Sequence, residues 1–329
     1  MSNWGRPTRI AASDSAVDLS ALLSRRLVFV TGKGGTGKST VTAAIARLAA
    51  RSGLRTLACE MDAKGALAAA LGVPTPGFVP AEVEQNLWAM TMDTESSLRE
   101  YLRVHLRVPF VARLGPLAST FDFVADAAPG VKEVLAVGKV CWEVRENHYD
   151  LVVVDAEASG HIASQIASPR IINSLVGRGP LGDQTRWMLD ILDDPARCAV
   201  VIVANPEDMV VTESLDLMAT IRNQTKTEVS LVVMNRCEES PMGAENEARL
   251  GRLMDSLASI PAAVPAELTA AATAMSALVG RAAEAARQVR RLVDSVAPVP
   301  VVQIPVADAA STTVGVVDHV MDALGGAVT

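Results

Sequence analysis

The 329-residue sequence predicts an α/β fold, with a mostly parallel, doubly wound sheet and an inserted helical subdomain. Short, continuously apolar segments alternate with helical stretches, which is the pattern of strands covered on both faces. Half of the residues are hydrophobic but only 3% are aromatic, so the core must be built from Ala, Val, Leu and Ile. Connections through helices favour parallel, right-handed crossovers, and such sheets bind ligands at the carboxyl ends of their strands.

Seven segments have the strand pattern, one of them (87–92) more weakly than the rest. They are Leu27–Thr31, Thr56–Glu60, Leu87–Met92, Leu151–Asp155, Ala199–Ala204, Ser230–Asn235 and Val299–Ile304. Small or polar residues stand at several of their carboxyl ends, namely Gly32, Glu60–Asp62, Asp155 and Asn235. We therefore expect one binding site at this edge of the sheet, assembled from segments far apart in the sequence.

The alternation of strands and helices is interrupted twice. Residues 94–148 separate two strands by more than a crossover needs, and residues 239–297 begin polar and become alanine-rich. We expect both to be helical insertions in one domain at 26–329, preceded by an N-terminal tail at 1–25. The tail carries charges rather than the apolar run of a signal peptide, and no segment is long enough to span a membrane. We therefore expect a cytoplasmic protein.

The formal net charge of −7 argues against a general nucleic-acid surface, so no nucleic-acid partner is expected. The sequence contains four cysteines, Cys59, Cys141, Cys198 and Cys237, which lie far apart and form no C-x-x-C pair. Neither a zinc site nor a disulfide framework is supported by this spacing. Three of them lie in or beside expected strands, where free cysteines are usually small buried residues.

A glycine-rich segment follows the first expected strand and precedes an alanine-rich helical stretch. It reads Thr-Gly-Lys-Gly-Gly-Thr-Gly-Lys-Ser-Thr and matches the phosphate-loop pattern G-x-x-x-x-G-K-[ST]. Its glycines let backbone N–H groups turn toward an anion, and the helix directs its positive dipole end there. Lys38 is expected to neutralise phosphate oxygens and Ser39 to bind Mg²⁺. The predicted nucleotide-binding residues of the loop are Gly32, Lys33, Gly34, Gly35, Thr36, Gly37, Lys38, Ser39 and Thr40.

Two acidic residues at strand ends extend this site. Asp62 follows the second strand, where a carboxylate can orient an attacking water, although an N-cap role is an alternative. Asp155 ends an apolar strand and is expected to reach Mg²⁺ together with Ser39, usually through water. The N–H of Gly160 is expected to contact a γ-phosphate. Lys33 is a second lysine on the rim of the loop, from which its side chain can point away from its own phosphate.

The order of K-G-G-T-G-K-S-T, an Asp after the second strand, D-x-x-x-[ST]-G-H, P-E-x-x-x-x-x-E and V-x-N-R resembles the arsenite-pump and tail-anchored-protein-targeting ATPase family. The resemblance covers about residues 26–325. It implies a P-loop NTPase fold, ATP and Mg²⁺ as cofactors, and a dimer in which Lys33 reaches the partner's phosphates. It also implies a catalytic role for Lys33 and for Asp62, which would polarise the attacking water.

The same resemblance implies further nucleotide contacts, from Glu213, from Asn235 at the adenine and from Pro305. Pro305 begins a segment, Pro305–Asp308, that in the family closes over the base. Two of these residues have simpler alternatives, because Glu213 also fits an exposed helix position and Asn235 a strand-end cap.

The sequence departs from the family pattern in both switch segments. The family's Asp-Pro-Ala-His is Asp62-Ala63-Lys64-Gly65 here, and Glu157 and Ala158 replace a small residue and a proline. A carboxylate at Glu157 would repel a γ-phosphate unless it is offset, so hydrolysis is expected to be slow, or Glu157 acts on the partner. The zinc-binding cysteine pair of the eukaryotic targeting factors is missing, and the arsenite-binding cysteines of the pump are not recognisable.

These observations predict an ATP-hydrolysing dimeric switch, paired with itself or with a paralogous ATPase. A hydrophobic protein client bound by helices at 94–148 and 163–197 is one expected partner. A membrane partner in metalloid transport is another, which would need clustered thiolates. A nucleotide-binding regulatory subunit paired with an active paralogue is the alternative without its own activity. A membrane-bound spatial organiser is disfavoured, because Gly315–Thr329 is short and lacks a basic face.

Overall fold

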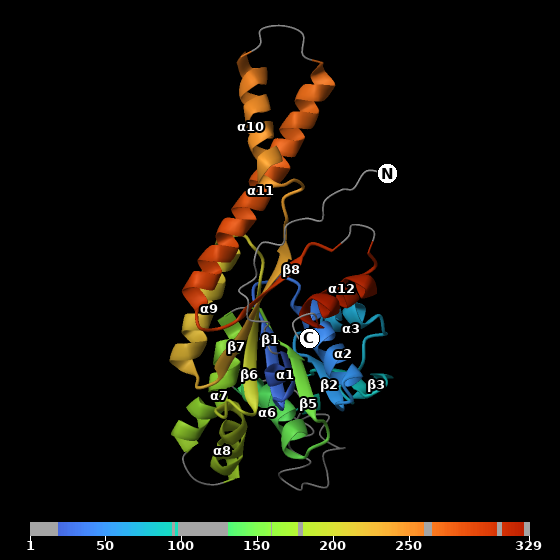
Figure 1. The fold of residues 1–329 in the computed structure, drawn as a ribbon. Coiled ribbons are helices and arrows are strands. Elements are labelled where there is room, and N and C mark those ends of the chain that lie inside the picture. The colour runs from blue at the N-terminus through green and yellow to red at the C-terminus, as the bar shows by residue number, and fades with distance from the viewer. Residues whose placement is uncertain are drawn as a thin grey trace, which may run out of the picture.

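The computed structural model describes residues 19–93, 96–97, 131–158, 160–176, 180–259, 265–307 and 311–325. Within these residues, eight strands form a sheet in the order β3-β4-β2-β5-β1-β6-β7-β8 (Figure 1). Every neighbouring pair is parallel except β3 with β4. The strands are β1 Leu27–Thr31, β2 Thr56–Glu60, β3 Ala81–Glu84, β4 Leu87–Thr91, β5 Leu151–Asp155, β6 Cys198–Ala204, β7 Glu228–Cys237 and β8 Val301–Pro305. The mostly parallel sheet predicted from the sequence is confirmed.

The sequence missed one strand. Strand β3 is polar and partly exposed at the edge of the sheet, so it lacks the apolar run that marks the other strands. It pairs antiparallel with β4 through a short connection in which Asn86 has a positive φ of 61°. Asn is one of the few residues that adopt this left-handed conformation readily, which allows the tight reversal.

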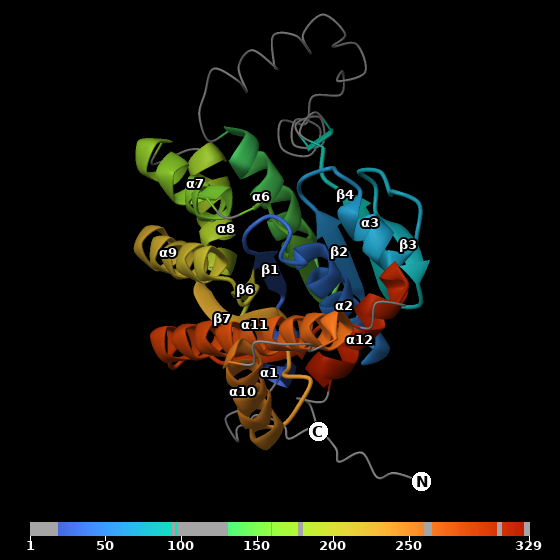
Figure 2. The ribbon, with the colours of Figure 1, turned by 90° about the horizontal axis from the view of Figure 1, so that it is seen from above.

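Helices cover both faces of the sheet (Figure 2). One face carries α1, α2, α3 and α12, while the other carries α6, α7, α8, α9 and the second half of α11. The helices are α1 Leu19–Leu23, α2 Lys38–Arg51, α3 Ala66–Leu71, α6 Val131–Arg145, α7 Gly160–Val176, α8 Pro180–Leu192, α9 Asp208–Gln224, α10 Ala244–Ser259, α11 Ala266–Val296 and α12 Thr313–Gly325. None of the described helices combines the length and apolar character needed to cross a membrane.

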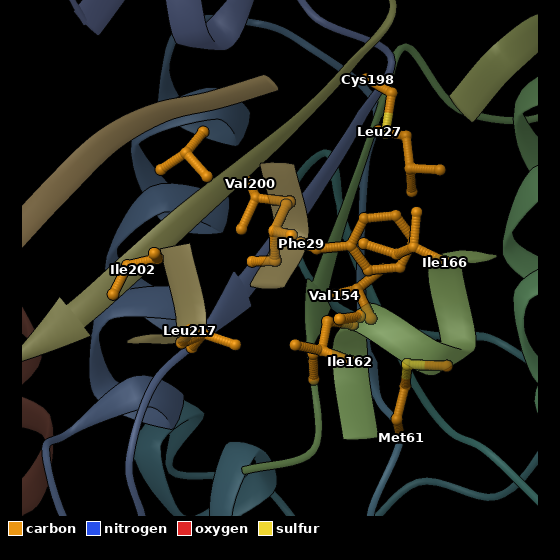
Figure 3. Close-up of a cluster of buried hydrophobic side chains, with 14 of the residues drawn as sticks. Leu27, Phe29, Met61, Val154, Ile162, Ile166, Cys198, Val200, Ile202 and Leu217 are labelled. Carbon is orange, nitrogen blue, oxygen red and sulfur yellow. The ribbon is translucent and has the colours of Figure 1, made fainter. Parts of the chain in front are cut away.

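The core consists of two apolar layers, one on each face of the sheet. In β1, Leu27 and Phe29 point into the first layer and Val28 and Val30 into the second, and all four are fully buried. Figure 3 shows Phe29 beside small and medium aliphatic side chains of neighbouring elements. This arrangement explains why the strands are apolar at every position rather than at alternate positions.

The described part of the first interruption, α6, packs on β1 and β5 and is the crossover helix into β5. Residues 98–130 of that segment lie outside the described residues. The second interruption forms α10 and α11, an antiparallel helix pair that extends beyond the sheet in Figure 1. The domain begins earlier than residue 26, because α1 buries Leu19 and Leu22 in the core, although it lies in the segment expected to be a tail.

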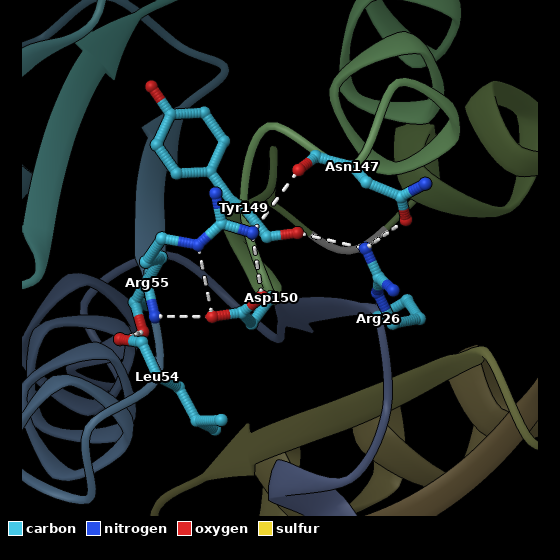
Figure 4. A network of polar contacts seen from close by, with 7 residues as sticks. Arg26, Leu54, Arg55, Asn147, Tyr149 and Asp150 are labelled. Atoms are coloured by element: carbon cyan, nitrogen blue, oxygen red, sulfur yellow. Dashed lines mark hydrogen bonds and ion pairs between the residues drawn. The ribbon is translucent and has the colours of Figure 1, made fainter.

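Polar contacts fix the amino ends of the central strands (Figure 4). The Arg55 guanidinium donates to Asp150 Oδ1 at 2.9 Å, and the Arg55 backbone N–H donates to Asp150 Oδ2 at 2.9 Å. The Arg26 side chain donates to Asn147 Oδ1 and to the Tyr149 carbonyl, each at 2.9 Å. These bonds join the starts of β1, β2 and β5 at the edge opposite the phosphate loop.

Candidate nucleotide-binding site

The loop between β1 and α2 requires glycine at two positions because neighbouring strands approach it closely. Gly32 has a φ of +147°, and a Cβ there would lie 2.1 Å from the Val203 carbonyl oxygen of β6. Gly37 has a φ of +94°, and a Cβ there would lie 2.4 Å from Asn235 Nδ2 of β7. The backbone thus curls against the ends of β6 and β7 in a shape that side chains would prevent.

Two residues from the end of β7 hold this loop in place. Asn235 Nδ2 donates to the Thr36 carbonyl at 2.8 Å, and Arg236 Nη1 donates to the Gly35 carbonyl at 3.1 Å. Within the loop, the buried Thr36 hydroxyl donates to the Lys33 carbonyl at 2.9 Å. Asn235, predicted to contact adenine, lies beside the phosphate loop. Arg236 was not predicted as a site residue, although the V-x-N-R pattern contains it.

Lys38, Ser39 and Asp155 meet where the loop enters α2. Ser39 Oγ donates to Asp155 Oδ2 at 2.5 Å, and Lys38 Nζ donates to the Lys33 carbonyl at 3.4 Å. Burial raises the pKa of Asp155 to about 6, although the Ser39 hydrogen bond and the Lys38 charge act against the increase. Burial also lowers the pKa of Lys38, against the attraction of Asp155. Thr40 follows in the first turn of α2.

The donor set beside Asp155 fits a magnesium ion. Asp155 is 5% exposed, and its second oxygen, Oδ1, is buried without a hydrogen-bond partner. The described residues contain no group of three or more His, Cys, Asp or Glu side chains that would hold a metal alone. Mg²⁺ typically needs only one or two protein oxygens, because phosphate oxygens and waters complete its shell. Ser39 and Asp155 are the residues that would hold it.

Unpaired oxygens recur along this edge of the sheet. Three strands end in such a residue: β2 in Glu60, β4 in Thr91 and β5 in Asp155, and Asn205 follows β6. Each of these four side chains has one buried oxygen without a hydrogen-bond partner. Glu60 uses its other oxygen to accept the Ala66 N–H at 2.8 Å. Buried unpaired acceptors are rare in folded proteins, so a row of them indicates a place for water, cations or ligand donors. Thr91 and Asn205 were missed because single polar residues after strands are common.

The first switch brings a lysine against the predicted water-orienting carboxylate. Lys64 Nζ forms an ion pair with Asp62 Oδ2, and this contact raises the pKa of Lys64, with smaller contributions from Glu157 and Glu60. The charge of Lys64 also contributes to the lowered pKa of Lys38. Lys64 therefore lies within electrostatic reach of the loop lysine, of Asp62 and of Glu157.

The second switch leads from β5 into α7. Glu157 is partly buried, and its carbonyl accepts a hydrogen bond from the Thr31 hydroxyl at 3.2 Å. Gly160 opens α7, and no atom of the described residues lies within 4 Å of the position of a Cβ there; Ser159 lies outside the described residues. At the other side of the site, Pro305 ends β8 and its carbonyl is 2.9 Å from His319 Nε2. The structure describes the expected base-covering segment only as far as residue 307.

Lys33 pairs with another predicted site residue. Its Nζ atom lies 2.7 Å from Glu213 Oε1 of α9, a residue 180 positions away in the sequence. The two side chains are 32% and 39% exposed, so the pair lies on the rim rather than inside the loop. Lys33 therefore points toward α9, whereas Lys38 points into the loop.

The model of a known family matches residues 25–179, and its description is "Anion-transporting ATPase". The matched segment contains the phosphate loop, Asp62, Asp155 and Gly160, which the fold brings to one edge of the sheet. Over these residues the chain is similar to this family. The family is one of ATPases, which agrees with the resemblance seen in the sequence and with the P-loop architecture of the sheet.

Several curated relatives of this chain carry related names. The ATPase BagA of Mycobacterium tuberculosis is 29% identical over 66% of this chain and 66% of its own length. A putative arsenical pump-driving ATPase of Halobacterium salinarum is 28% identical over 67% of this chain and 37% of its own. The ATPase get3 of Schizosaccharomyces japonicus is 28% identical over 50% of this chain and 53% of its own. The chain thus matches about two thirds of the mycobacterial relative and less of the other two.

Proposed function

We propose that this chain is an ATP-hydrolysing molecular switch in which two copies meet at the phosphate-loop edge. The observation that carries the proposal is the direction of Lys33. This lysine lies on the loop rim and pairs with Glu213 at 2.7 Å, outside the cradle of its own chain. A long cation held at the rim is available to a phosphate presented by a second copy. The names of the curated relatives, which are ATPases, agree with the ATP part of the proposal.

Within one chain, the loop backbone and Lys38 would bind the phosphates. Mg²⁺ held by Ser39 and Asp155 would neutralise charge on the β- and γ-phosphate oxygens. Asp62 would accept a hydrogen bond from the attacking water, provided that Lys64 moves away from it. The γ-phosphate is the stronger competitor for Lys64, because it carries more negative charge than one carboxylate. Nucleotide binding would thereby free Asp62 for the water.

A hydrophobic protein client is the partner that the chain supports best. Helix α7 exposes Ile171 and Leu175, at 55% and 80%, within the segment expected to bind a client. The thiols needed for a metalloid partner are all buried, and burial raises the pKa of Cys59 and of Cys237 to about 12. Pairing with a paralogue, a cytoplasmic location and the absence of a nucleic-acid partner stay predictions.

The purified chain tests the proposal. Sedimentation velocity with MgATP should show a monomer-to-dimer shift that Lys33→Ala loses, while calorimetry shows ATP binding by the single chain retained. Asp62→Asn should still bind ATP and dimerise but hydrolyse it about 10²-fold more slowly, as expected for loss of a water-orienting group. Lys226→Ala is the matched control, since Lys226 is an exposed lysine just before β7, at the opposite edge. Normal dimerisation and turnover in Lys33→Ala would refute the role of this lysine in a second copy.

A further inference from the structure

Helix α11 is much longer than its place in the sheet requires. Its 31 residues extend about 46 Å, whereas the five residues of the following strand β8 span about 17 Å. All of its buried residues except Ala272 lie from Ala282 onward, where the helix packs on α9 and β7. The half before Ala282 has Ala272 as its one buried residue, and α10 packs against α11. We call α10 together with Ala266–Arg281 the arm.

The arm extends from the edge of the sheet that carries the phosphate loop. Strand β7 ends at Cys237, immediately after Asn235 and Arg236 contact the loop, and the chain then enters α10. Figure 1 shows the arm projecting on the side to which the β8 arrowhead points, which is the carboxyl edge of the parallel strands. A second copy that approaches this edge therefore meets the arm as well as the loop.

Polar contacts connect the arm to the loop by two routes. Glu238 Oε2, one residue after β7, lies 3.3 Å from Arg281 Nε at the base of the arm. Farther along α11, Arg291 donates to Asp208 at 2.7 Å and to Thr212 at 2.9 Å in the first turns of α9. Helix α9 carries Glu213, which holds Lys33. Glu238 lies two residues after Arg236, which contacts the loop, and Glu213 contacts Lys33, so both routes lead from the phosphate loop to α11.

Some of the exposed apolar side chains lie on the arm and near the carboxyl edge of the sheet. Of the ten large hydrophobic residues that are exposed in the described part, half lie on the arm, just after β8 or at the start of α9, the helix that follows β6. They are Leu253, Leu268 and Leu278 on the arm, and Met209 and Val306 at the edge. The described charges of the arm are of mixed sign, and Glu245 pairs with Arg249 at 2.7 Å within α10. This balance favours a protein surface over an anionic lipid surface, which selects basic faces.

From this arrangement we propose that the arm binds a second copy of this chain. When two copies meet at the phosphate-loop edges, each arm lies alongside the other copy, and Leu268 and Leu278 become buried against it. Twofold symmetry makes the two contacts identical. This inference rests on the proposed dimer, and it adds that contact outside the nucleotide site holds the dimer together.

The test compares charged substitutions at two places on the same helix of the full chain. The arm variant combines Leu268→Glu with Leu278→Glu and so introduces charge on the arm. The control variant, Val293→Glu, introduces charge in the half of α11 that packs on the sheet domain. Val293 is a suitable control because it is 37% exposed, close to the 38% of Leu278. Dimerisation with a non-hydrolysable ATP analogue and Mg²⁺ is followed by sedimentation velocity. The arm variant should dimerise roughly tenfold or more weakly, because a charge replaces buried leucines, while the Val293 variant matches the parent. Calorimetric binding of the analogue to single chains should be equal in all three proteins.

The outcomes separate the arm from the dimer. A parent chain that stays monomeric with the analogue overturns both proposals. A parent chain that dimerises, with an arm variant that dimerises equally well, overturns the arm contact alone. As a second measurement, Leu268→Cys reports burial without adding charge, because the four native cysteines are all buried. Its reaction with a maleimide should slow at least severalfold when the analogue is added, and an unchanged rate would also overturn the arm contact.

Discussion

The two ends of strand β5 carry aspartates in opposite situations. Asp150, directly before the strand, receives hydrogen bonds from the Arg55 side chain and backbone, and these lower its pKa. Asp155, the last residue of the strand, keeps one oxygen unpaired, and burial raises its pKa to about 6. The protein itself stabilises the ionised form of Asp150, whereas the ionised form of Asp155 would be stabilised by a bound cation.

The same contrast holds for the two edges of the sheet. At the amino edge, Arg26 and Arg55 bridge strands and loops, as Figure 4 shows. At the carboxyl edge, buried oxygens of Glu60, Asp155 and Asn205 lack partners. The amino edge also has buried atoms without a partner, Nε of Arg25 and of Arg26, but these are donors, whereas the unpaired oxygens of the carboxyl edge can accept from a ligand or bind a cation. The two edges therefore differ in the kind of group left unpaired, and the acceptors lie at the edge where nucleotide binding is proposed.

The largest effect is expected at the carboxyl edge. Lys38→Ala should weaken ATP binding by roughly 10²-fold or more, because it removes a charge-assisted hydrogen bond to phosphate. Isothermal titration calorimetry measures the affinity, with Lys226→Ala as the matched lysine at the amino edge. Unchanged affinity in Lys38→Ala would mean that the loop does not bind the phosphates.

Asp155→Asn should separate stability from binding. The pKa of Asp155 is about 6 in the folded protein, above the reference value of 3.8, so folding favours the protonated carboxyl. The stability that this contributes is fully present below about pH 3.8 and is lost as the pH rises through about 6. At pH 8 the buried, ionised carboxylate therefore costs free energy. Its replacement by the amide should stabilise the nucleotide-free protein by about 1–3 kcal/mol at pH 8 and by little at pH 4. Urea unfolding at both pH values measures this, and Mg²⁺-dependent ATP binding should be lost in the same variant.

The proposed difference between the two ends of β5 would be wrong if Asp155→Asn were more stable than the parent only at pH 4, or less stable than the parent at pH 8. It would mean that Asp155 contributes to the fold as Asp150 does, and that its unpaired oxygen is not available to a cation.

Glu157→Ala should have an intermediate effect on binding. The Glu157 carboxylate is expected to repel a γ-phosphate, with part of its charge offset by Lys64. Its removal should tighten ATP binding by roughly threefold to tenfold and leave turnover equal or faster, since partial exposure screens the repulsion. Affinity and steady-state turnover are measured for the one variant, with Glu146→Ala as an exposed acidic control. Slower turnover at unchanged affinity would instead make Glu157 a second water-orienting group.

The sequence predicted the features that are local in the chain. Apolar runs located seven of the eight strands in the described residues, and the spacing of Gly32, Gly37, Lys38 and Ser39 located the loop. The polar strand β3 was missed, since an exposed edge strand has no apolar run. The pairing of Lys33 with Glu213 could not be predicted, because it depends on how α9 packs across the sheet. Helical periodicity also gave no indication that half of α11 leaves the sheet. The roles assigned to the site residues stay predictions.

The smallest effect is expected at the amino end of β5, where Asp150→Asn is the counterpart of Asp155→Asn. The lowered pKa of Asp150 contributes stability above its normal titration range, and this is lost as pH falls through the lowered value. Because Asp150 and Arg55 are 38% and 49% exposed, water screens their attraction strongly. The substitution should lower Tm by roughly 1–3 °C at pH 7 and by less at pH 3. It should leave ATP affinity unchanged, since the residue lies at the far end of the strand from the loop. A loss of ATP affinity in Asp150→Asn would show that the two ends of β5 are coupled, and the separation of folding from binding along this strand would then be wrong.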